Sequence, residues 1–373
     1  MNAEQGRMVA ASELFRSDDL LVRRVGGFGG PICYVTFDSY TDHRTLDRPG
    51  FGEHHFRARG IDAVHVLSRD NHWYQYPELD EALAAAASVT ADYGRVIAYG
   101  SSMGGFAALH YGATCGATVG IALSPQYTVD PAVVPFDRRW AEDVARISFR
   151  EDALPPLDCP YIVYDPLDPH DARHFELFAA RWPVNGIPVR HGGHPVAAYL
   201  LETDLLGGLL RAVEAGPIDA EAFARELRNR RRRSAHYFSI LAQRVPTHRP
   251  RQKVALAELA VATQGDNPLY HMQLASALDA TGEFDAAYSI HQRAITMTNG
   301  GFHPRHALLL HHERRGELDR ALEIAEALLR EHSEVLWLPK TRDRLRRKKR
   351  HGSWIGRLAH KLFLDPLLDK LGV

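Results

Sequence analysis

Short apolar runs alternate with helical patterns over the first 213 residues of the chain. Each run has the length and composition of a buried strand, and the runs lie at 32–37, 63–67, 96–98, 161–164 and 187–190. Small or apolar residues at helical spacing follow two of them, at Phe106–Leu109 and Pro195–Leu210. This alternation predicts an α/β domain with a mainly parallel sheet sandwiched between helices.

A glycine-flanked serine follows the run at 96–98. Gly100, Ser102 and Gly104 form the pattern G-x-S-x-G between a predicted strand and a predicted helix. Small residues are needed there because the strand and the helix pass close together, and the sharp turn exposes the serine hydroxyl above the sheet. The pattern predicts that Ser102 is a nucleophile.

Candidate partners for this serine follow two later strands. Asp165, Asp168 and Asp171 come after the run at 161–164, and His191 and His194 come after the run at 187–190. The chain order is therefore serine, acid, histidine, and each group lies just past a strand, at the edge where open α/β sheets bind ligands.

Residues 31 to about 213 resemble a compact α/β-hydrolase domain on these motifs. In that family the acid usually lies about three residues beyond its strand, so the resemblance implies Asp168, with Asp165 and Asp171 as alternatives. The histidine usually follows one or two glycines and precedes the last helix, which implies His194. The resemblance predicts a catalytic triad of Ser102, Asp168 and His194.

The same resemblance implies an oxyanion hole made of two backbone N–H groups. One belongs to Met103, the residue after the nucleophile, and the other to the loop after the run at 32–37, at Asp38 or Ser39. We assign the second donor to Ser39, although the His-Gly pair common in the family is absent there.

Two loops at the predicted strand ends carry residues suited to bind a substrate. Asn71 and Trp73 follow the run at 63–67, and Gln126 begins a long loop that also carries Arg139 and Trp140. We predict that Asn71, Trp73 and Gln126 line the substrate pocket. The alternative, which is stronger for any one of these loop residues taken alone, is that the aromatic side chains belong to the core and the arginines are solvated.

The second half of the chain contains a repeat. The segment Gly282–Ala287 recurs as Gly316–Ala321, an offset of 34 residues. A period of 34 residues with paired helices resembles the tetratricopeptide repeat over about 267–333. The resemblance implies an all-α domain, which either binds a protein partner or packs on the first domain.

These patterns predict four parts of the chain. In chain order, they are an α/β-hydrolase domain at 1–213, a helical linker at 214–252, tetratricopeptide-like repeats at 253–335 and a basic amphipathic tail at 336–373.

Charge is uneven although the net charge is only −1. The segment from Lys340 to Lys361 contains ten Lys or Arg and one acid, Asp343. Apolar residues recur near its end at roughly helical spacing, at Trp354, Leu358, Leu362 and Phe363. A basic amphipathic helix of this kind can lie on an anionic membrane surface, and the alternative is that it docks on the repeats. We expect no nucleic-acid partner, because no recognised binding motif is present.

Composition is that of a globular protein, with 45% hydrophobic and 24% charged residues. No secretory signal is readable and no apolar run has the length of a membrane span, so we expect a cytoplasmic protein that is either free or peripheral at the membrane. We expect no metal and no cofactor, because the spacings typical of zinc or phosphate sites are absent.

The sequence predicts a serine hydrolase that acts on ester bonds, of the carboxylesterase or deacetylase type. An O-acyltransferase acting on a glycan or glycoprotein is an alternative, because only the final acyl acceptor differs. A catalytically silent scaffold that binds a protein partner through the repeats is a second alternative, since fold alone does not establish catalysis.

Overall fold

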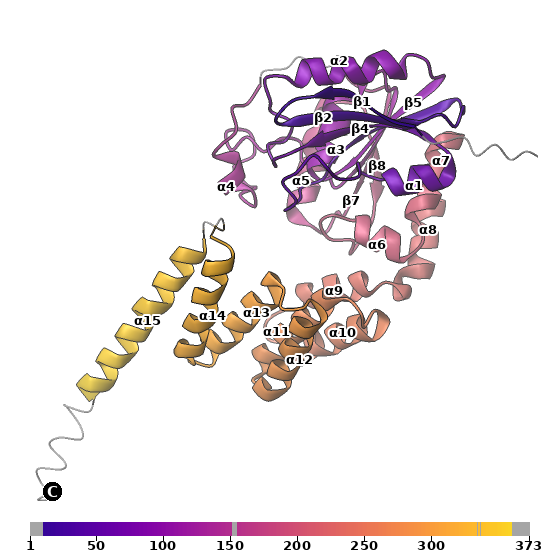
Figure 1. Cartoon of the computed structure of the whole chain (residues 1–373). Helices are drawn as coiled ribbons and strands as arrows, with labels where there is room; N and C mark the ends of the chain where they lie inside the picture. Colours follow the sequence, from indigo (N-terminus) through magenta and orange to yellow (C-terminus); the bar gives the residue numbers. More distant parts are fainter. Residues whose placement is uncertain (1–9, 151–154, 334, 336, 360–373) are drawn as a thin grey trace, which may run out of the picture. The chain divides into compact units, whose positions relative to one another are not determined.

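The computed structural model describes residues 10–150, 155–333, 335 and 337–359, with side chains up to His351 in the last helix (Figure 1). The chain divides into two compact units after Arg231. The first unit is α/β, and the second is all-helical within its described residues.

One mixed sheet forms the centre of the first unit (Figure 1). Its strands, within the described residues, are β1 (Ala10–Arg16), β2 (Leu20–Gly26), β3 (Ile32–Phe37), β4 (Asp62–Ser68), β5 (Arg95–Ser101), β6 (Val119–Leu123), β7 (Cys159–Tyr164) and β8 (Asn185–Pro188). Their order across the sheet is β1-β2-β4-β3-β5-β6-β7-β8. β2 pairs antiparallel with both β1 and β4, and every pair from β4 to β8 is parallel. The predicted α/β fold, with a mainly parallel sheet between helices, is confirmed.

Helices flank this sheet because its central strands are apolar on both faces. Every residue of β4 and β6 is buried, as a parallel sheet covered on both sides requires. The helices are α1 (Glu53–Arg59), α2 (Leu79–Thr90), α3 (Met103–Tyr111), α4 (Ala141–Val144), α5 (Pro169–Arg181), α6 (Ala197–Glu202), α7 (Leu206–Ala215) and α8 (Ala220–Arg230). The helix predicted over 195–210 is therefore two helices, and Asp204 between them has a left-handed φ of 56°.

The second unit is a series of helix pairs. They are α9 (Ala235–Arg244) with α10 (Pro250–Thr263), α11 (Pro268–Thr281) with α12 (Phe284–Met297), and α13 (Phe302–Arg314) with α14 (Leu318–Glu331). α11 and α13 begin 34 residues apart, at 268 and 302, and α12 and α14 do so at 284 and 318. Ala287 and Ala321, which the repeat aligns, are both fully buried, so the sequence period is also a packing period.

The basic tail begins as α15 (Leu338–Ala359), whose first half packs on the preceding helices. Leu345 is fully buried in a cluster with Leu309 of α13 and Ala325 of α14. Arg346 forms an ion pair of 2.6 Å with Glu326, and Arg344 pairs with Glu313. The docked alternative therefore accounts for this half of the helix.

The apolar positions on which the membrane interpretation depends lie elsewhere. The side chains of Trp354 and Leu358, and the whole of Leu362 and Phe363, fall outside the described residues. Among the helices that the structure does describe, none combines the length and the apolar character needed to cross a bilayer.

Candidate active site

Ser102 lies at a strained turn between β5 and α3. Its φ of 53° and ψ of −116° fall outside the regions that a non-glycine residue ordinarily adopts. A Cβ at Gly104 would overlap the carbonyl oxygen of Phe37, and one at Gly100 would overlap the carbonyl oxygen of Gly104. The two glycines of the motif are therefore required by the close approach of α3 to β5 and to the end of β3.

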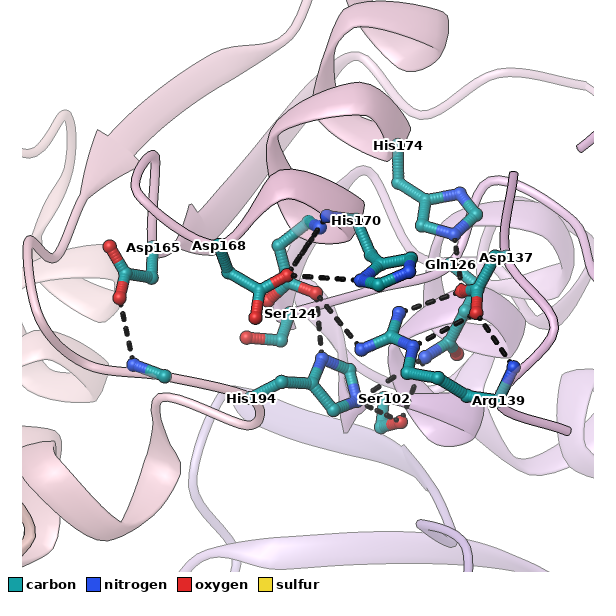
Figure 2. Close-up of polar contacts among 12 residues, drawn as sticks. Ser102, Ser124, Gln126, Asp137, Arg139, Asp165, Asp168, His170, His174 and His194 are labelled. Carbon is teal, nitrogen blue, oxygen red and sulfur yellow. Dashed lines mark hydrogen bonds and ion pairs between the residues drawn. The ribbon is translucent and has the colours of Figure 1, made fainter. Parts of the chain in front are cut away.

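A chain of hydrogen bonds runs from this serine through a histidine to a carboxylate (Figure 2). Ser102 Oγ lies 3.0 Å from His194 Nε2, and His194 Nδ1 lies 2.7 Å from Asp171 Oδ1. Because a carboxylate only accepts, Nδ1 carries the proton and Nε2 faces the serine as an acceptor. The side chain of Asp171 is 1% exposed and that of His194 is 11% exposed, so the carboxylate is buried beneath a ring that substrate can reach.

The expectation that Asp168 holds His194 is wrong. Asp168 is the N-cap of α5, and its carboxylate accepts hydrogen bonds from the backbone N–H groups of His170, at 3.0 Å, and Asp171, at 3.1 Å. An N-cap carboxylate is oriented toward the first turn of its own helix. The residue three positions later lies inside that turn and faces the histidine instead.

Asp165, the remaining aspartate of the turn, holds the loop that carries His194. Asp165 is fully buried, and its carboxylate accepts hydrogen bonds from the backbone N–H groups of Leu167, His191 and Gly193 at 2.9–3.2 Å. It therefore ties the turn after β7 to the loop that carries His194. The three aspartates have three separate tasks.

The two predicted oxyanion donors lie on segments that meet at Ser102. Met103 is the first residue of α3, where backbone N–H groups have no partner within the helix. Ser39 follows β3, and its hydroxyl donates to the carbonyl oxygen of Ser101 at 2.7 Å. That hydrogen bond holds the loop after β3 against the nucleophile turn.

Asp38 anchors the same loop. Its carboxylate forms a 2.7 Å ion pair with Arg48, which also donates to the carbonyl oxygen of Ser68 at 2.7 Å. Burial raises the pKa of Asp38 to about 6, although Arg48 opposes this shift. The loop that carries Ser39 is thus attached to the end of β4 as well as to Ser101.

Two of the three predicted pocket residues contact the nucleophile or its neighbours. The Nε2 of Gln126 lies 3.0 Å from Ser102 Oγ, and the indole Nε1 of Trp73 donates to Gln126 Oε1 at 3.1 Å. Asn71 has a different place, because its amide exchanges hydrogen bonds of 3.0 and 2.9 Å with the backbone of Thr41. Asn71 therefore holds a loop and is not brought to Ser102.

Aromatic rings form a wall beside the histidine. The Trp140 ring lies 4.7 Å from that of Tyr40, 5.7 Å from that of Trp73 and 6.3 Å from the imidazole of His194, measured between centroids. Asp143 of α4 accepts a hydrogen bond of 2.9 Å from the Tyr40 hydroxyl. These contacts attach the long loop after β6 to the loops after β3 and β4, beside His194.

A second polar network lies behind the triad (Figure 2). Arg139 pairs with Asp137 at 2.7 Å and approaches Asp171 Oδ1 at 3.7 Å. His174 Nδ1 accepts from the backbone N–H of Tyr127, so its Nε2–H donates to Asp137 at 3.0 Å. Burial alone would raise the pKa of Asp137, but the hydrogen bonds from His174 and Arg139 hold that pKa well below its usual range.

This network was only partly visible in the sequence. Arg139 and Trp140 stand out as polar and aromatic residues of a long loop, whereas Asp137 and His174 lie on segments 37 residues apart that only the fold brings together. His174 falls at buried helical spacing in α5 and carries no local signal of its own.

The side chains best suited to hold a metal lie in the helical unit and not at Ser102. Asp279, His291 and His311 are buried and each offers a ligand atom within 4.8 Å of the others. The carboxylate of Asp279 already accepts from His311 at 2.6 Å and from Arg314 at 3.2 Å. Because the guanidinium would repel a cation, we interpret this group as a structural network.

The chain matches no known family profile and no curated protein sequence. It is similar in structure to a capsule O-acetyltransferase of Neisseria meningitidis serogroup A, with 14% identity and a TM-score of 0.36 over 48% of this chain and 85% of that one. It is also similar to Est1E from Butyrivibrio proteoclasticus, with 11% identity and a TM-score of 0.37 over 55% and 99% of the two chains. A third similar structure is MGS-M1, an α/β hydrolase from a deep-sea metagenome library, with 13% identity and a TM-score of 0.36 over 59% and 98%. Likeness at this level carries no argument about activity.

Proposed function

We propose that this protein is a serine-dependent enzyme that cleaves ester bonds by acyl transfer, of the carboxylesterase or deacetylase type. The observation that carries the proposal is the unbroken series of hydrogen bonds from Ser102 through His194 to Asp171. It begins at a strained turn that places the Ser102 hydroxyl beside His194 and ends at a buried carboxylate, which is the arrangement that nucleophilic catalysis by serine needs.

Acylation follows from this geometry. Ser102 Oγ attacks the ester carbonyl carbon while its proton passes to His194 Nε2, and Asp171 stabilises the imidazolium that forms. The carbonyl oxygen takes the negative charge and accepts hydrogen bonds from the backbone N–H groups of Met103 and Ser39. When the carbonyl re-forms, the bond to the alcohol oxygen breaks and that oxygen takes the proton from Nε2. The alcohol leaves and an acyl-serine remains.

Deacylation repeats these steps with a second oxygen nucleophile. Its proton passes to His194 Nε2 as it attacks the acyl carbon, and Ser102 Oγ leaves with that proton. Water as nucleophile releases a carboxylic acid, whereas a hydroxyl group of a second substrate yields a new ester. The first outcome defines an esterase and the second an acyltransferase.

The test is covalent labelling of Ser102. We expect p-nitrophenyl acetate to add about 42 Da to the intact protein, one acetyl group, and Ser102→Ala to abolish this adduct. Ser101→Ala is the matched control, because Ser101 is a buried neighbour whose hydroxyl oxygen has no hydrogen-bond partner among the described residues. An adduct that persists in Ser102→Ala, or a parent protein inert to acetyl and fluorophosphonate probes, would contradict the proposal.

For the helical unit, we infer tetratricopeptide-like repeats. Within the described residues, three successive helix pairs support this interpretation, as does the 34-residue spacing of α11 with α13 and of α12 with α14. Gly282 and Gly316 lie just past the ends of α11 and α13, and both have a positive φ, of 81° and 74°. A repeat array of this kind is a candidate surface for a protein partner.

A further inference from the structure

We propose that Gln126 is a further catalytic residue, which donates a hydrogen bond to Ser102 Oγ and thereby directs the serine proton to His194. This inference rests on the proposed function. Gln126 follows β6, the neighbour of the strand that carries Ser102, and it is fully buried. Its Nε2 lies 3.0 Å from Ser102 Oγ and 3.4 Å from His194 Nε2, so the amide is beside both reacting atoms (Figure 2).

Trp73 determines which end of the amide faces the serine. An indole N–H can only donate, so the atom of Gln126 that lies 3.1 Å from Trp73 Nε1 must be the carbonyl oxygen. The NH₂ group is therefore turned toward Ser102. Because this group only donates, Oγ must accept from it.

This hydrogen bond from Gln126 orients the Ser102 hydroxyl hydrogen toward His194. With a lone pair of Oγ engaged by Gln126, the hydroxyl hydrogen points to His194 Nε2, which is the acceptor of the imidazole. A glutamine with the opposite orientation would present its carbonyl oxygen to Ser102 and compete with His194 for that hydrogen. The indole therefore selects the productive arrangement of the hydroxyl.

The same donor contributes when Oγ carries charge. During attack the oxygen loses its proton to His194, and during deacylation it leaves the acyl carbon as Nε2–H returns the proton. A hydrogen bond from a neutral amide stabilises the partial negative charge at both points. Gln126 need not gain or lose a proton in either step.

The turn that carries Trp73 has a strained backbone. Trp73 and Tyr74 both have left-handed φ angles, of 48° and 58°, and both side chains are fully buried. The Tyr74 hydroxyl lies 3.1 Å from the carbonyl oxygen of Val66 and 3.3 Å from that of Asp38, which fastens the turn to the sheet. Strain of this kind persists where the surrounding structure enforces it, as it does at many functional sites. Trp73 is a positioning residue in this arrangement.

The experiment compares Gln126→Met with Gln126→Glu by the rate of fluorophosphonate labelling. Methionine keeps the length of the side chain but donates no hydrogen bond, so we expect labelling to slow by about tenfold. Glutamate keeps the shape and still accepts from Trp73, but its second oxygen accepts the serine proton, so labelling should slow further than in Gln126→Met. A purely packing role predicts the reverse order or no change.

A second readout does not depend on activity. The indole hydrogen of Trp73, assigned by its loss in Trp73→Phe, should exchange with solvent faster in Gln126→Met and at the parental rate in Gln126→Glu. Gln273→Met is the matched control, because Gln273 accepts a hydrogen bond from Ser239 in the other unit. It should change neither readout.

Two results would overturn the inference. Labelling within twofold of the parent in both Gln126 variants would show that the donor has no role, while the proposed function would stand. Unchanged indole exchange in Gln126→Met would show that Trp73 does not hold the amide. Failure of the parent itself to label would instead refute the proposed function, on which the inference rests.

Discussion

Asp171 Oδ1 lies 2.7 Å from His194 Nδ1, while Asp168, one helical turn earlier, accepts two backbone hydrogen bonds from the start of α5. The two carboxylates are alike in sequence context and differ in what they stabilise. One stabilises a charge that forms only during the reaction, and the other stabilises the helix that carries it.

Substitution of Asp171 should therefore remove activity without removing the fold. Asparagine at this position keeps the shape but donates to Nδ1, which places the ring proton on Nε2, where it cannot accept from Ser102. We expect kcat for p-nitrophenyl acetate to fall by about 10⁴-fold in Asp171→Asn.

Asp168→Ala is the matched control for that variant. It should keep kcat within about twofold and lower the free energy of unfolding by about 1 kcal/mol, the usual cost of losing an N-cap. Steady-state kinetics and urea denaturation of both variants measure the two effects separately. A large loss of kcat in Asp168→Ala with Asp171→Asn active would reverse the assignment.

The close approach at Gly104 predicts a stability defect. A Cβ there would overlap the backbone carbonyl of Phe37, and neither segment can move without displacing a buried strand. We expect Gly104→Ala to lower the free energy of unfolding by about 3 kcal/mol. The rate of labelling of Ser102 should also fall, because the turn that carries Ser102 and the loop after β3 are forced apart.

Gly30→Ala is the comparison for this substitution. A Cβ at Gly30 meets no heavy atom within 4 Å, and its φ is not in the left-handed region. It should leave unfolding and labelling unchanged. Parental stability in Gly104→Ala would mean that α3 is not packed against β3 as the structure shows.

The buried network of the helical unit predicts sensitivity to acid. Burial alone would raise the pKa of Asp279, but hydrogen bonds from His291 and His311 lower it below its usual value. A carboxyl group whose pKa is lower in the folded state stabilises the fold above its unfolded pKa, near 4. That stabilisation is lost as the pH falls through the lower, folded value. We therefore expect thermal stability to drop as the pH falls below about 4.

Asp279→Asn should abolish this part of the acid response. It should also cost about 1–3 kcal/mol at pH 7, because an NH₂ group replaces one acceptor oxygen and leaves a buried donor without its partner. Calorimetry of the full chain at pH 3.5 and pH 7 provides the comparison. Asp285→Asn serves as control, since that side chain is fully exposed, and an identical acid response in Asp279→Asn and the parent would refute the interpretation.

The nucleophile and the histidine were predictable because each has a local signature. Gly100 and Gly104 mark the turn around Ser102, and the glycines before His194 mark the last loop. The acid was not assigned correctly, since three aspartates share one turn. A signal was present nevertheless: Asp168 precedes Pro169, and an Asp followed by Pro at the first helical position is typical of an N-cap. That signal assigns Asp168 to the helix and leaves Asp165 and Asp171 as candidates, between which only the contacts of the fold decide.

Other features depend on contacts between distant segments and have no local signature. The link from Trp73 to Gln126 joins loops 53 residues apart. The sequence predicted a helical linker over 214–252, and α8 and α9 lie there. That α9 pairs with α10 had no signal, because this pair precedes the two repeats that share a recognisable motif. The interruption after α6 occurs at Asp204, a non-glycine residue in a left-handed conformation that composition does not reveal.

The place of Asp171 on α5 makes the site sensitive to rotation as well as to distance. Each residue turns an α-helix by about 100°, so a single insertion between the N-cap Asp168 and Asp171 would point a different side chain at His194. A change in the length of this turn could be tolerated only if the acid moved along the helix by a compensating step. The length of this turn and the position of the carboxylate along the helix must therefore change together.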